Sequence, residues 1–407
     1  FPDRQPQSAR GARRSPFHER LVAQRAHFRD VSGWECPGWY APEGQQPDEG
    51  PLTYGRPQWF PHWEAEHRAC REDVIAMDMS FMGKFLVQGR DAGAFLDYLS
   101  ANEVNGDSEK ITYTQWLNDD GLLEADLTVI KLDSEKFMVV TSDVAHRHTE
   151  TWMKRHISVD QHVFVTDVTS GYGQLNIQGP RSRELLQSIT SADLSNEAFP
   201  FRTAREIDIG LGRVLCVRIT YAGELGYELN IPSEQALHVY DRIVQAGVQF
   251  GLRHAGLKAL ASLRLEKGYR DYGHDIDNMD DPFSTGLGFA VRLKKESDFI
   301  GKAASIERKA SIKYRHRLVS ILLRDPEPIL MHHEIVHRNG KPVGSIRAGS
   351  FGHTLGAGVG LAMVEGDPVN AAYLSEGEWT VVIAGRVYPA DVSLKPFYDP
   401  EMVRIRS

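Results

Sequence analysis

The sequence predicts an α+β protein in which a pseudo-duplicated core of split-βαβ type is followed by a small β-barrel or jelly-roll domain. An order of strand, helix, strands and helix is indicated twice between residues 84 and 269, which suggests two similar units. After residue 313 the pattern changes to short strands separated by Gly and Asn-Gly turns. The chain has 407 residues, more than one hydrophobic core usually serves, so two or three domains are expected. We divide it into a lead-in (1–60), an α+β core (61–312) and a barrel domain (313–407).

The lead-in is rich in Pro and Gly and is predicted to be irregular. Its aromatic side chains are expected to lie across a domain surface with their rings buried: Trp34, Trp39, Tyr40, Trp59 and Phe60. Residues 1–16 are rich in Arg and Pro, which is typical of a linker from a longer polypeptide or of the remnant of a targeting segment. A helix is predicted from about His62 to Ile75.

The first unit of the core contains a hairpin on which much of the functional argument depends. Residues 84–88 read as a strand and 91–100 as a helix with Asp91 at its N-cap. Residues 111–117 and 122–132 flank Asp120-Gly121, a dipeptide that supplies the positive φ of a tight turn. Because side chains alternate along a strand, the polar Glu124, Asp126 and Thr128 share one face, and the other face carries Leu123, Ala125, Leu127 and Val129. A strand (136–142) and a helix (144–156) complete the unit.

The second unit begins with a strand at 173–179 and a helix at 180–189 that has Pro180 in its first turn. Strands at 213–221 and 227–232 follow, and then helices at 234–250 and 257–269. In the barrel domain, strands are predicted at 318–323, 334–347, 355–364, 379–385 and 386–393.

Composition and charge exclude several classes of function. Hydrophobic residues make up 41% and charged residues 25%, as in ordinary globular enzymes. The formal net charge of -8 argues against a nucleic-acid partner, and no apolar run approaches the roughly 20 residues that span a bilayer. Cys36, Cys70 and Cys216 form neither a CxxC pair nor a disulfide framework. A reducing compartment is therefore expected, the cytoplasm or, in a eukaryote, the mitochondrial matrix.

Asp126 is the first candidate for chemistry. On its own, an acid on an alternating strand is most often a solvated or salt-bridged surface group. Its setting raises its interest, because it lies close to a tight hairpin in a stretch that contains Tyr113 and Trp116. Both rings are suited to lining the pocket of a flat heteroaromatic ligand.

A second candidate stretch is TYAGELGYELN, residues 220–230. Its glycines indicate a sharp turn or a close backbone approach. Glu224 and Glu228 could each grip an amino-pyrimidine edge, because a carboxylate matches two adjacent N–H donors. A turn with exposed acids is the simpler interpretation of the same residues.

A third stretch, SLRLEKGYRDYGHDID (262–277), places Arg264 and Lys267 on one face of a helix, although Arg264 is better explained as the structural partner of an internal acid. His274, Asp275 and Asp277 have a spacing that fits no standard zinc or calcium site, so no metal is predicted. The glycines between Gly356 and Gly360 lack a βαβ unit around them, which favours barrel-strand glycines over a nucleotide-binding loop.

Five stretches in this order resemble the glycine-cleavage T-protein, or aminomethyltransferase, family: MDMSFMGKFLVQGRDAGAFL, TYTQWLNDDGLLEADLTVIKL, NIQGPRSRELL, RITYAGELGYEL and SLRLEKGYRDYGHDI. The resemblance covers about residues 60–395. Within the family, four stretches are most similar to the folate-binding C-terminal half of dimethylglycine and sarcosine dehydrogenases and oxidases: SPFHERL, GWECPGWYAPEG, EAEHRACREDVIAMDMS and LEKGYRDYGHD.

The resemblance implies a ring of domains around a central folate pocket. The family's catalytic aspartate corresponds to Asp126, its pterin-binding glutamate to Glu228 rather than Glu224, and the tyrosine partner of that glutamate to Tyr221. Other cofactor-binding positions correspond to Met82, Tyr113 and Tyr269.

Two positions depart from the pattern of glycine-cleavage proteins. The acid that usually precedes the catalytic aspartate is Ala125 here, and an arginine common in T-proteins is Leu260. Recognition of the folate tail is therefore expected to differ or to be weaker. Both departures favour a dehydrogenase-type folate half over a glycine-cleavage protein.

The resemblance also implies the chemistry. A reduced folate amine attacks an electrophilic methylene or methyl group on a donor, and the carboxylate of Asp126 accepts a proton and stabilises the positive charge that develops on nitrogen. Such acid–base help is typically worth about 10²–10⁴ in rate. We expect tetrahydrofolate to receive the carbon of a dimethylglycine or sarcosine oxidation product, with FAD only on a missing N-terminal domain or a flavoprotein partner.

Two alternatives remain open. One is a stand-alone folate-dependent demethylase that acts on an onium or methoxy donor. The other is a non-catalytic regulatory subunit with the same fold, against which the retention of Asp126, Tyr221 and Glu228 argues.

Overall fold

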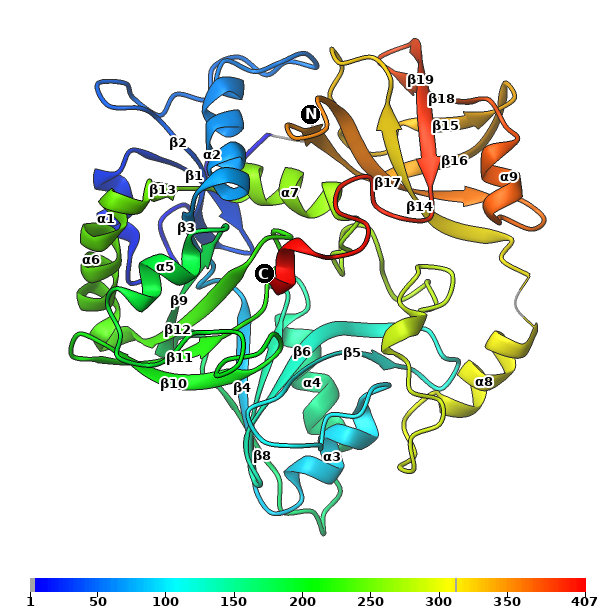
Figure 1. Cartoon of the computed structure of the whole chain (residues 1–407). Coiled ribbons are helices and arrows are strands. Elements are labelled where there is room, and N and C mark those ends of the chain that lie inside the picture. The colour runs from blue at the N-terminus through cyan, green and yellow to red at the C-terminus, as the bar shows by residue number, and fades with distance from the viewer. Residues whose placement is uncertain (1–3, 312) are drawn as a thin grey trace.

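The computed structural model describes residues 4–311 and 313–407 and shows two lobes built on β-sheets and a third built on a barrel (Figure 1). The predicted α+β class and the C-terminal β-domain are both confirmed. No helix in the described ranges is long and apolar enough to cross a membrane.

The lead-in holds more regular structure than its composition indicated. After α1 (His18–Ala23), the strands β1 (Ala26–Val31) and β2 (Trp34–Tyr40) form an antiparallel hairpin. Its turn is Ser32-Gly33, and both residues have positive φ, so this dipeptide was a turn signal that the Pro and Gly content obscured. The prediction of buried aromatic rings is confirmed, because all seven residues of β2, as well as Trp59 and Phe60, are buried.

The first core unit is a five-stranded antiparallel sheet in the order β5-β6-β7-β4-β8. The predicted hairpin is confirmed, with Gly121 at φ +73 in its turn. Asp91 precedes the first helix, but its side chain forms no cap; its carboxylate instead accepts a hydrogen bond from the backbone N–H of His162 at 2.7 Å. The elements are β4 (Gly83–Gln88), α3 (Ala92–Leu99), β5 (Ile111–Leu117), β6 (Leu123–Asp133), β7 (Lys136–Thr141), α4 (His146–His156) and β8 (Phe164–Asp167).

The second core unit repeats the first one element for element. Its sheet order, β10-β11-β12-β9-β3-β13, matches that of the first sheet once the inserted strand β3 (Ile75–Asp78) is set aside, so the predicted pseudo-duplication is confirmed. Gly89 and Gly179 each follow the first strand of their unit, and both have φ +126. The elements are β9 (Tyr172–Gln178), α5 (Ser182–Gln187), β10 (Ala204–Ile209), β11 (Gly212–Val217), β12 (Gly226–Pro232), α6 (Ala236–Gly247) and β13 (Arg253–His254).

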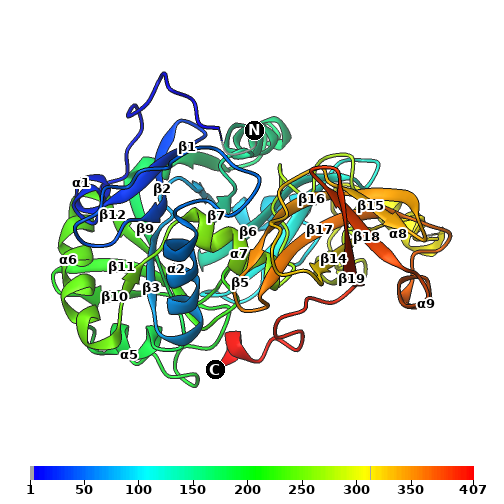
Figure 2. The same cartoon turned by 90° about the horizontal axis from the view of Figure 1, so that it is seen from above.

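Two helices connect these units to the barrel. Helix α2 (Phe60–Glu72) packs beside α7 (Leu257–Glu266), and α7 also packs on the barrel (Figure 2). Helix α7 ends earlier than predicted because Gly268 adopts φ +62, a left-handed conformation that stops helices. Tyr269 and Arg270 consequently lie in a loop rather than on the helix. Helix α8 (Lys302–Ser311) leads into the barrel domain.

The C-terminal domain is a closed six-stranded barrel in the order β14-β17-β16-β15-β18-β19, which decides between the barrel and jelly-roll predictions. A side chain at Gly360 would approach the carbonyl oxygen of Ala348 to 2.6 Å, so glycine there permits close strand packing, as predicted for the 356–360 stretch. The elements are β14 (His316–Leu323), β15 (Ile335–Arg338), β16 (Lys341–Gly352), β17 (Ala357–Glu365), α9 (Ala371–Ser375), β18 (Trp379–Ile383) and β19 (Arg386–Ser393).

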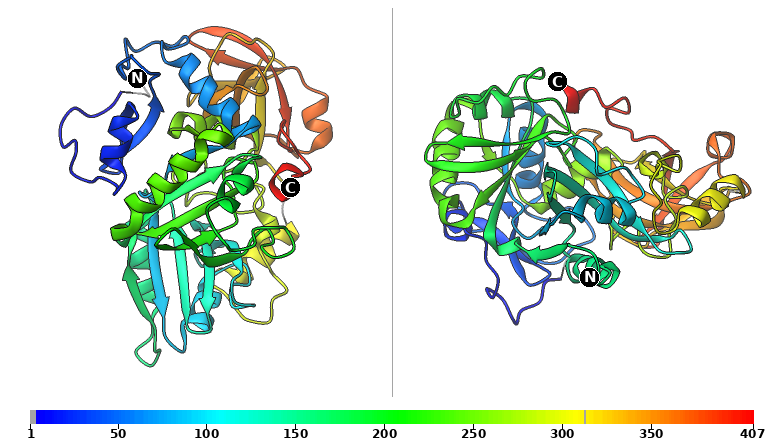
Figure 3. Two further views of the ribbon diagram at one scale, coloured as in Figure 1. Left: turned by 60° about the vertical axis from the view of Figure 1, so that its left-hand side comes forward. Right: turned by 90° about the horizontal axis from the view of Figure 1, so that it is seen from below.

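After β19 the chain leaves the barrel and returns to the core, where residues 398–407 lie beside the second core unit (Figure 3). Asp399 forms an ion pair with Lys267 at 2.8 Å, and Arg404 forms one with Glu224 at 2.8 Å. The tail therefore ties the barrel to the two segments that follow α7 and precede β12.

Candidate functional site

Strand β6 presents Asp126 on the face opposite to the core. Leu123, Ala125, Leu127 and Val129 are at most 3% exposed, whereas Glu124, Asp126 and Thr128 are half-buried, so the predicted two-faced strand is confirmed. In the register of the hairpin, Asp126 lies opposite Gln115. Trp116, which we expected to line a ligand pocket, instead lies on the core face with no exposed surface and donates its indole N–H to Ser100. Tyr113 and Gln115 occupy the face of Asp126.

The surroundings of Asp126 keep its carboxylate close to the point of protonation. Burial raises the pKa of Asp126 from 3.8 to about 6, while hydrogen bonds from Tyr113 and Gln115 oppose that rise. The amide of Gln115 donates to Oδ1 at 2.8 Å. Among nearby charges, Asp271 raises the pKa of Asp126 and Arg270 lowers it. The carboxylate is therefore largely ionised near neutral pH but can still accept a proton.

Glu228 is held on β12 by two side chains of the neighbouring strand β9. The amides of Gln174 and Asn176 donate to its two carboxylate oxygens at 3.3 and 3.2 Å. Burial raises the pKa of Glu228 to about 7, and the positive charge of Lys84 acts against that rise. Both oxygens are thus oriented by amides, as recognition of a pair of N–H donors requires.

Lys84 and Met82 connect Glu228 to the first core unit. The ammonium of Lys84 has no exposed surface and donates to the carbonyl oxygens of Ser80 and Met82, at 3.2 and 2.8 Å. Burial lowers the pKa of Lys84 to about 7. The side chain of Met82 is half-buried and packs, together with Tyr221, against an apolar cluster that contains Leu260.

Tyr221 and Tyr269 form a stacked pair, with ring centroids 5.9 Å apart and ring planes 19° from parallel. The hydroxyl of Tyr221 donates to the carbonyl oxygen of Arg270 at 2.6 Å. Burial raises the pKa of Tyr113 and of Tyr221 well above its usual value, and the charge of Asp126 acts in the same direction on both, so both phenols stay protonated.

The structure thus brings the sequence-predicted residues into one connected set, which we call the Asp126 site. Each member is half-buried. Tyr113 hydrogen-bonds to Asp126, the charge of Asp126 acts on Tyr221, and Tyr221 stacks on Tyr269. Lys84 connects the other two members, because it donates to the carbonyl oxygen of Met82 and its charge acts on Glu228. The members of the site are Met82, Tyr113, Asp126, Tyr221, Glu228 and Tyr269.

Glu224, the alternative to Glu228, lies outside this set. It is 1% exposed and forms ion pairs with Arg71 and Arg404 at 3.0 and 2.8 Å, while Tyr398 donates to it at 2.7 Å. Arg71 also pairs with Glu266 at 2.8 Å. A carboxylate that is this fully bonded within the protein has no free edge for a ligand.

The third candidate stretch has a structural role at Arg264, as predicted, because this residue forms a buried ion pair with Asp275 at 2.9 Å. Within residues 4–311 and 313–407, no group of His, Cys, Asp and Glu side chains could hold a metal ion. Leu260 is buried in the apolar cluster against which Met82 and Tyr221 also pack, and its side chain offers no hydrogen-bond donor.

Four side chains near the site were not anticipated from the sequence: Lys84, Gln115, Arg270 and Asp271. The alternation that placed Asp126 also places Gln115 opposite it, so the hairpin register was a usable signal for that residue. Lys84 is the first residue of a predicted strand, and Arg270 is the residue after a predicted helix. No local pattern distinguishes either residue from a surface cation.

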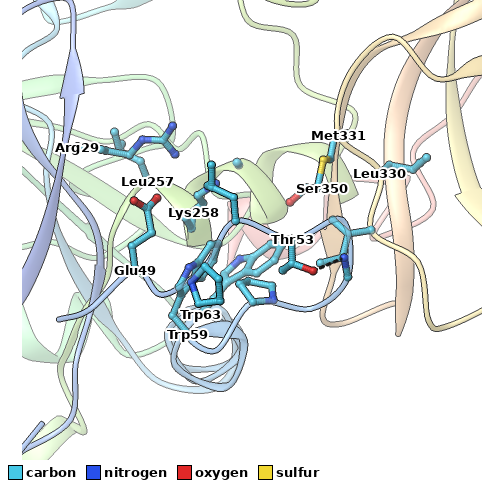
Figure 4. A pocket seen from close by; sticks show the side chains of 17 residues that line it. Arg29, Glu49, Thr53, Trp59, Trp63, Leu257, Lys258, Leu330, Met331 and Ser350 are labelled. Carbon is cyan, nitrogen blue, oxygen red and sulfur yellow. Dashed lines mark hydrogen bonds between the residues drawn. The ribbon is translucent and has the colours of Figure 1, made fainter. Parts of the chain in front are cut away.

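A separate surface pocket lies where residues 49–59, helix α7 and the barrel meet (Figure 4). Trp59, Trp63 and Lys258 line it from the core, and Met331 and Ser350 line it from the barrel. None of the six residues of the Asp126 site contributes to its walls.

Comparisons with known proteins place the chain in a family. The family model described as the GCVT N-terminal domain matches residues 17–295, and the one described as the glycine cleavage T-protein C-terminal barrel domain matches residues 316–399. The chain is also similar to a solved structure, the glycine cleavage system aminomethyltransferase T from Bartonella henselae, with a TM-score of 0.80 at 21% identity over 95% of this chain and 98% of that one. At that identity the likeness shows the fold.

Proteins of similar sequence support the same family. A 4-methylaminobutanoate oxidase (formaldehyde-forming) of Paenarthrobacter nicotinovorans is 40% identical over 100% of this chain and 48% of its own length. A mitochondrial sarcosine dehydrogenase of Mus musculus is 32% identical over the same shares, so the chain spans about half the length of these two relatives. An aminomethyltransferase of Clostridium botulinum (strain Kyoto / Type A2) is 36% identical over 77% of this chain and 84% of its own length. The chain therefore belongs to the glycine cleavage T-protein, or aminomethyltransferase, family.

Proposed function

We propose that this chain transfers a one-carbon unit to tetrahydrofolate from a donor formed by oxidation of an N-methyl amino acid, with Asp126 as the catalytic carboxylate. The observation that carries the proposal is the setting of Asp126: a carboxylate with a pKa near 6, fixed by Gln115 and Tyr113. Tyrosine rings and the oriented carboxylate of Glu228 belong to the same site. A general base works best when its pKa lies near the operating pH.

The residues present fit a reduced folate. The carboxylate of Glu228 would accept hydrogen bonds from the amino-pyrimidine edge, with Gln174 and Asn176 holding it in position. The stacked rings of Tyr221 and Tyr269 offer flat apolar surface for a heteroaromatic ring, and Met82 packs against the same apolar cluster as Tyr221. When bound, tetrahydrofolate supplies the nucleophilic amine that receives the carbon.

The part of Asp126 follows from its charge and its surroundings. Its ionised carboxylate would accept a proton from the reacting amine and would stabilise positive charge on nitrogen. Because the site is half-buried, this charge acts through a medium less polar than water and is correspondingly more effective. The same shielding slows the attack of water on an electrophilic one-carbon donor.

The names of the relatives support the choice of donor. One is named for 4-methylaminobutanoate and another for sarcosine, and both names denote an N-methyl amino acid. Since the chain spans about half of each, we propose that FAD resides outside it, on a preceding domain or on a partner protein. A stand-alone demethylase would not need that flavin, and a flavoprotein requirement for sarcosine turnover distinguishes the two readings.

The test is calorimetric titration with tetrahydrofolate. We expect saturable binding by the wild-type chain and by Asp126→Asn, and loss of one-carbon transfer in the variant once the flavin half is supplied. Absence of measurable tetrahydrofolate binding by the wild-type chain would refute the proposal. Full transfer activity in Asp126→Asn would remove the catalytic role of Asp126 while leaving folate binding in place.

A further inference from the structure

Arg270 is a half-buried cation that donates no hydrogen bond to a carboxylate in the described part of the chain. In residues 4–311 and 313–407, its guanidinium hydrogen-bonds only to backbone carbonyl oxygens: Nε donates to Thr285 at 2.9 Å and Nη1 to Gly268 at 2.5 Å. Arg264, six residues earlier, shows the contrast, because both carboxylate oxygens of Asp275 accept hydrogen bonds from it. A buried charge is ordinarily paired, since burial without a partner is costly.

Backbone atoms hold this guanidinium in one orientation. Its two carbonyl partners lie in the loop after α7 and in the 282–287 segment, and Tyr221 donates to the carbonyl oxygen of Arg270 itself at 2.6 Å. Gly286 has φ +78, and a Cβ there would lie 2.5 Å from Nη2. Glycine thus makes room for the Nη2 edge, which has no hydrogen-bond acceptor in the described part of the chain.

The guanidinium acts on the Asp126 site. Its positive charge lowers the pKa of Asp126. In turn, the phenol of Tyr113, the carboxylates of Asp275 and Asp126 and the phenol of Tyr221 all act to raise the pKa of Arg270. Burial outweighs these effects and lowers the pKa of Arg270 below its usual value. The protein therefore leaves the charge undercompensated next to its candidate catalytic carboxylate.

We propose that Arg270 binds a carboxylate group of a substrate at the Asp126 site. The planar fork of arginine suits a carboxylate. Nη2, which packs against Gly286, is the guanidinium nitrogen that has no hydrogen-bond acceptor in residues 4–311 and 313–407. Two substrates of the proposed function carry that group. One is tetrahydrofolate, in its glutamyl tail, and the other is the donor, which keeps the carboxylate of the N-methyl amino acid from which it is formed. The inference rests on the proposed function, and it assigns a role to a cation whose charge acts on Asp126.

Calorimetry with two variants and four probes tests this assignment. Arg270→Met removes the charge and Arg270→Lys keeps the charge but loses the fork; thermal melting confirms that each is folded. Arg338→Met is the matched control, because Arg338 is also half-buried and donates to a backbone carbonyl, that of Tyr373 at 3.1 Å, on the barrel. The probes are tetrahydrofolate, a tetrahydropterin without the aminobenzoyl-glutamate tail, sarcosine and dimethylamine.

A charge-assisted hydrogen bond predicts that Arg270→Met weakens binding of the anchored carboxylate by about 10- to 100-fold, with Arg270→Lys in between. Weaker tetrahydrofolate binding with unchanged tetrahydropterin binding assigns Arg270 to the folate tail. Loss of the preference for sarcosine over dimethylamine assigns it to the donor. Wild-type affinities for both carboxylate probes in Arg270→Met overturn the inference, and they leave the proposed function standing as long as the wild type binds tetrahydrofolate.

Discussion

Replacing Gln115 by Leu tests how the site sets the protonation of Asp126. Gln115 has no exposed surface, and its amide N–H donates to Asp126 at 2.8 Å. Its own carbonyl oxygen is buried and has no hydrogen-bond partner among the residues that the structure describes. Leucine has a similar shape, so the substitution removes the donor and also removes an unsatisfied acceptor. Little loss of global stability is expected, because the second change offsets part of the first.

The size of the effect follows from the hydrogen bond. A bond to a charged group contributes about 1.5–3 kcal/mol, and about 1.4 kcal/mol corresponds to one pKa unit. The pKa of Asp126, about 6 in the wild type, is therefore expected to rise to roughly 7 to 8. At neutral pH the carboxylate changes from mostly ionised to half protonated or more. If Asp126 is the base, kcat/KM at pH ~7 falls about 2- to 10-fold and recovers at higher pH.

Carbon NMR of labelled aspartate carboxyl groups measures this pKa without an activity assay. The resonance of Asp126 is assigned by its absence in Asp126→Asn and is titrated from pH ~4 to pH ~9, a range that brackets both expected values. Gln187→Leu is the control. The amide of Gln187 also donates a hydrogen bond of 2.8 Å, but it donates to the backbone carbonyl oxygen of Ala192 and lies on the exposed face of α5. An unchanged Asp126 titration in Gln115→Leu would refute the reasoning.

Three further predictions concern stability and folate binding. Because the pKa of Asp126 is raised in the folded state, ionisation of this carboxyl group destabilises the protein as the pH rises from about 4 through about 6. Asp126→Asn should therefore be more stable than the wild type above that window, by up to about 3 kcal/mol, and equally stable below it. Urea unfolding at several pH values measures the difference. Lys84→Met removes the charge that lowers the pKa of Glu228, so a larger share of Glu228 should be protonated at neutral pH. The affinity for tetrahydrofolate should therefore fall at neutral pH and recover toward higher pH. A loss of affinity that does not change with pH in calorimetry would contradict this account. Arg71→Met leaves Glu266 and Glu224 without the buried cation that they share, so the free energy of unfolding should fall by about 3–5 kcal/mol, measured as a lower Tm. The control is Arg324→Met, which breaks the exposed ion pair with Asp391 and should leave the Tm unchanged.

Local patterns predicted the fold well where one signal controls the structure. Alternation along β6 and the Asp-Gly turn before it gave the correct hairpin and the correct face for Asp126. The repeated order of strands and helices predicted two similar units, and the structure shows that their sheets have matching strand order. The prediction was wrong where signals competed, as in the lead-in, where Pro and Gly content outweighed the Ser32-Gly33 turn that joins β1 to β2.

The site was only partly readable from the residues themselves. Asp126 and Glu228 were named because ordered stretches resemble a family, and the choice of Glu228 over Glu224 rested on the same resemblance. The structure supplies a physical reason for that choice. Glu224 forms buried ion pairs with Arg71 and Arg404, which lie far from it in the sequence. The expectation that Trp116 lines a ligand pocket was wrong because side chains alternate along a strand. Gln115 lies on the face of Asp126, so the next residue, Trp116, points into the core.

By itself, the sequence determined the hairpin of β5 and β6 and the face of β6 that carries Asp126, since turn chemistry and side-chain alternation act between near neighbours. The tertiary structure alone decided the electrostatics of the site. The pKa of Asp126 near 6, the burial of Lys84 and the orientation of the Arg270 guanidinium by backbone carbonyl oxygens all depend on which distant segments surround each group. Burial and Coulomb interactions act through space rather than along the chain, so no local pattern records them.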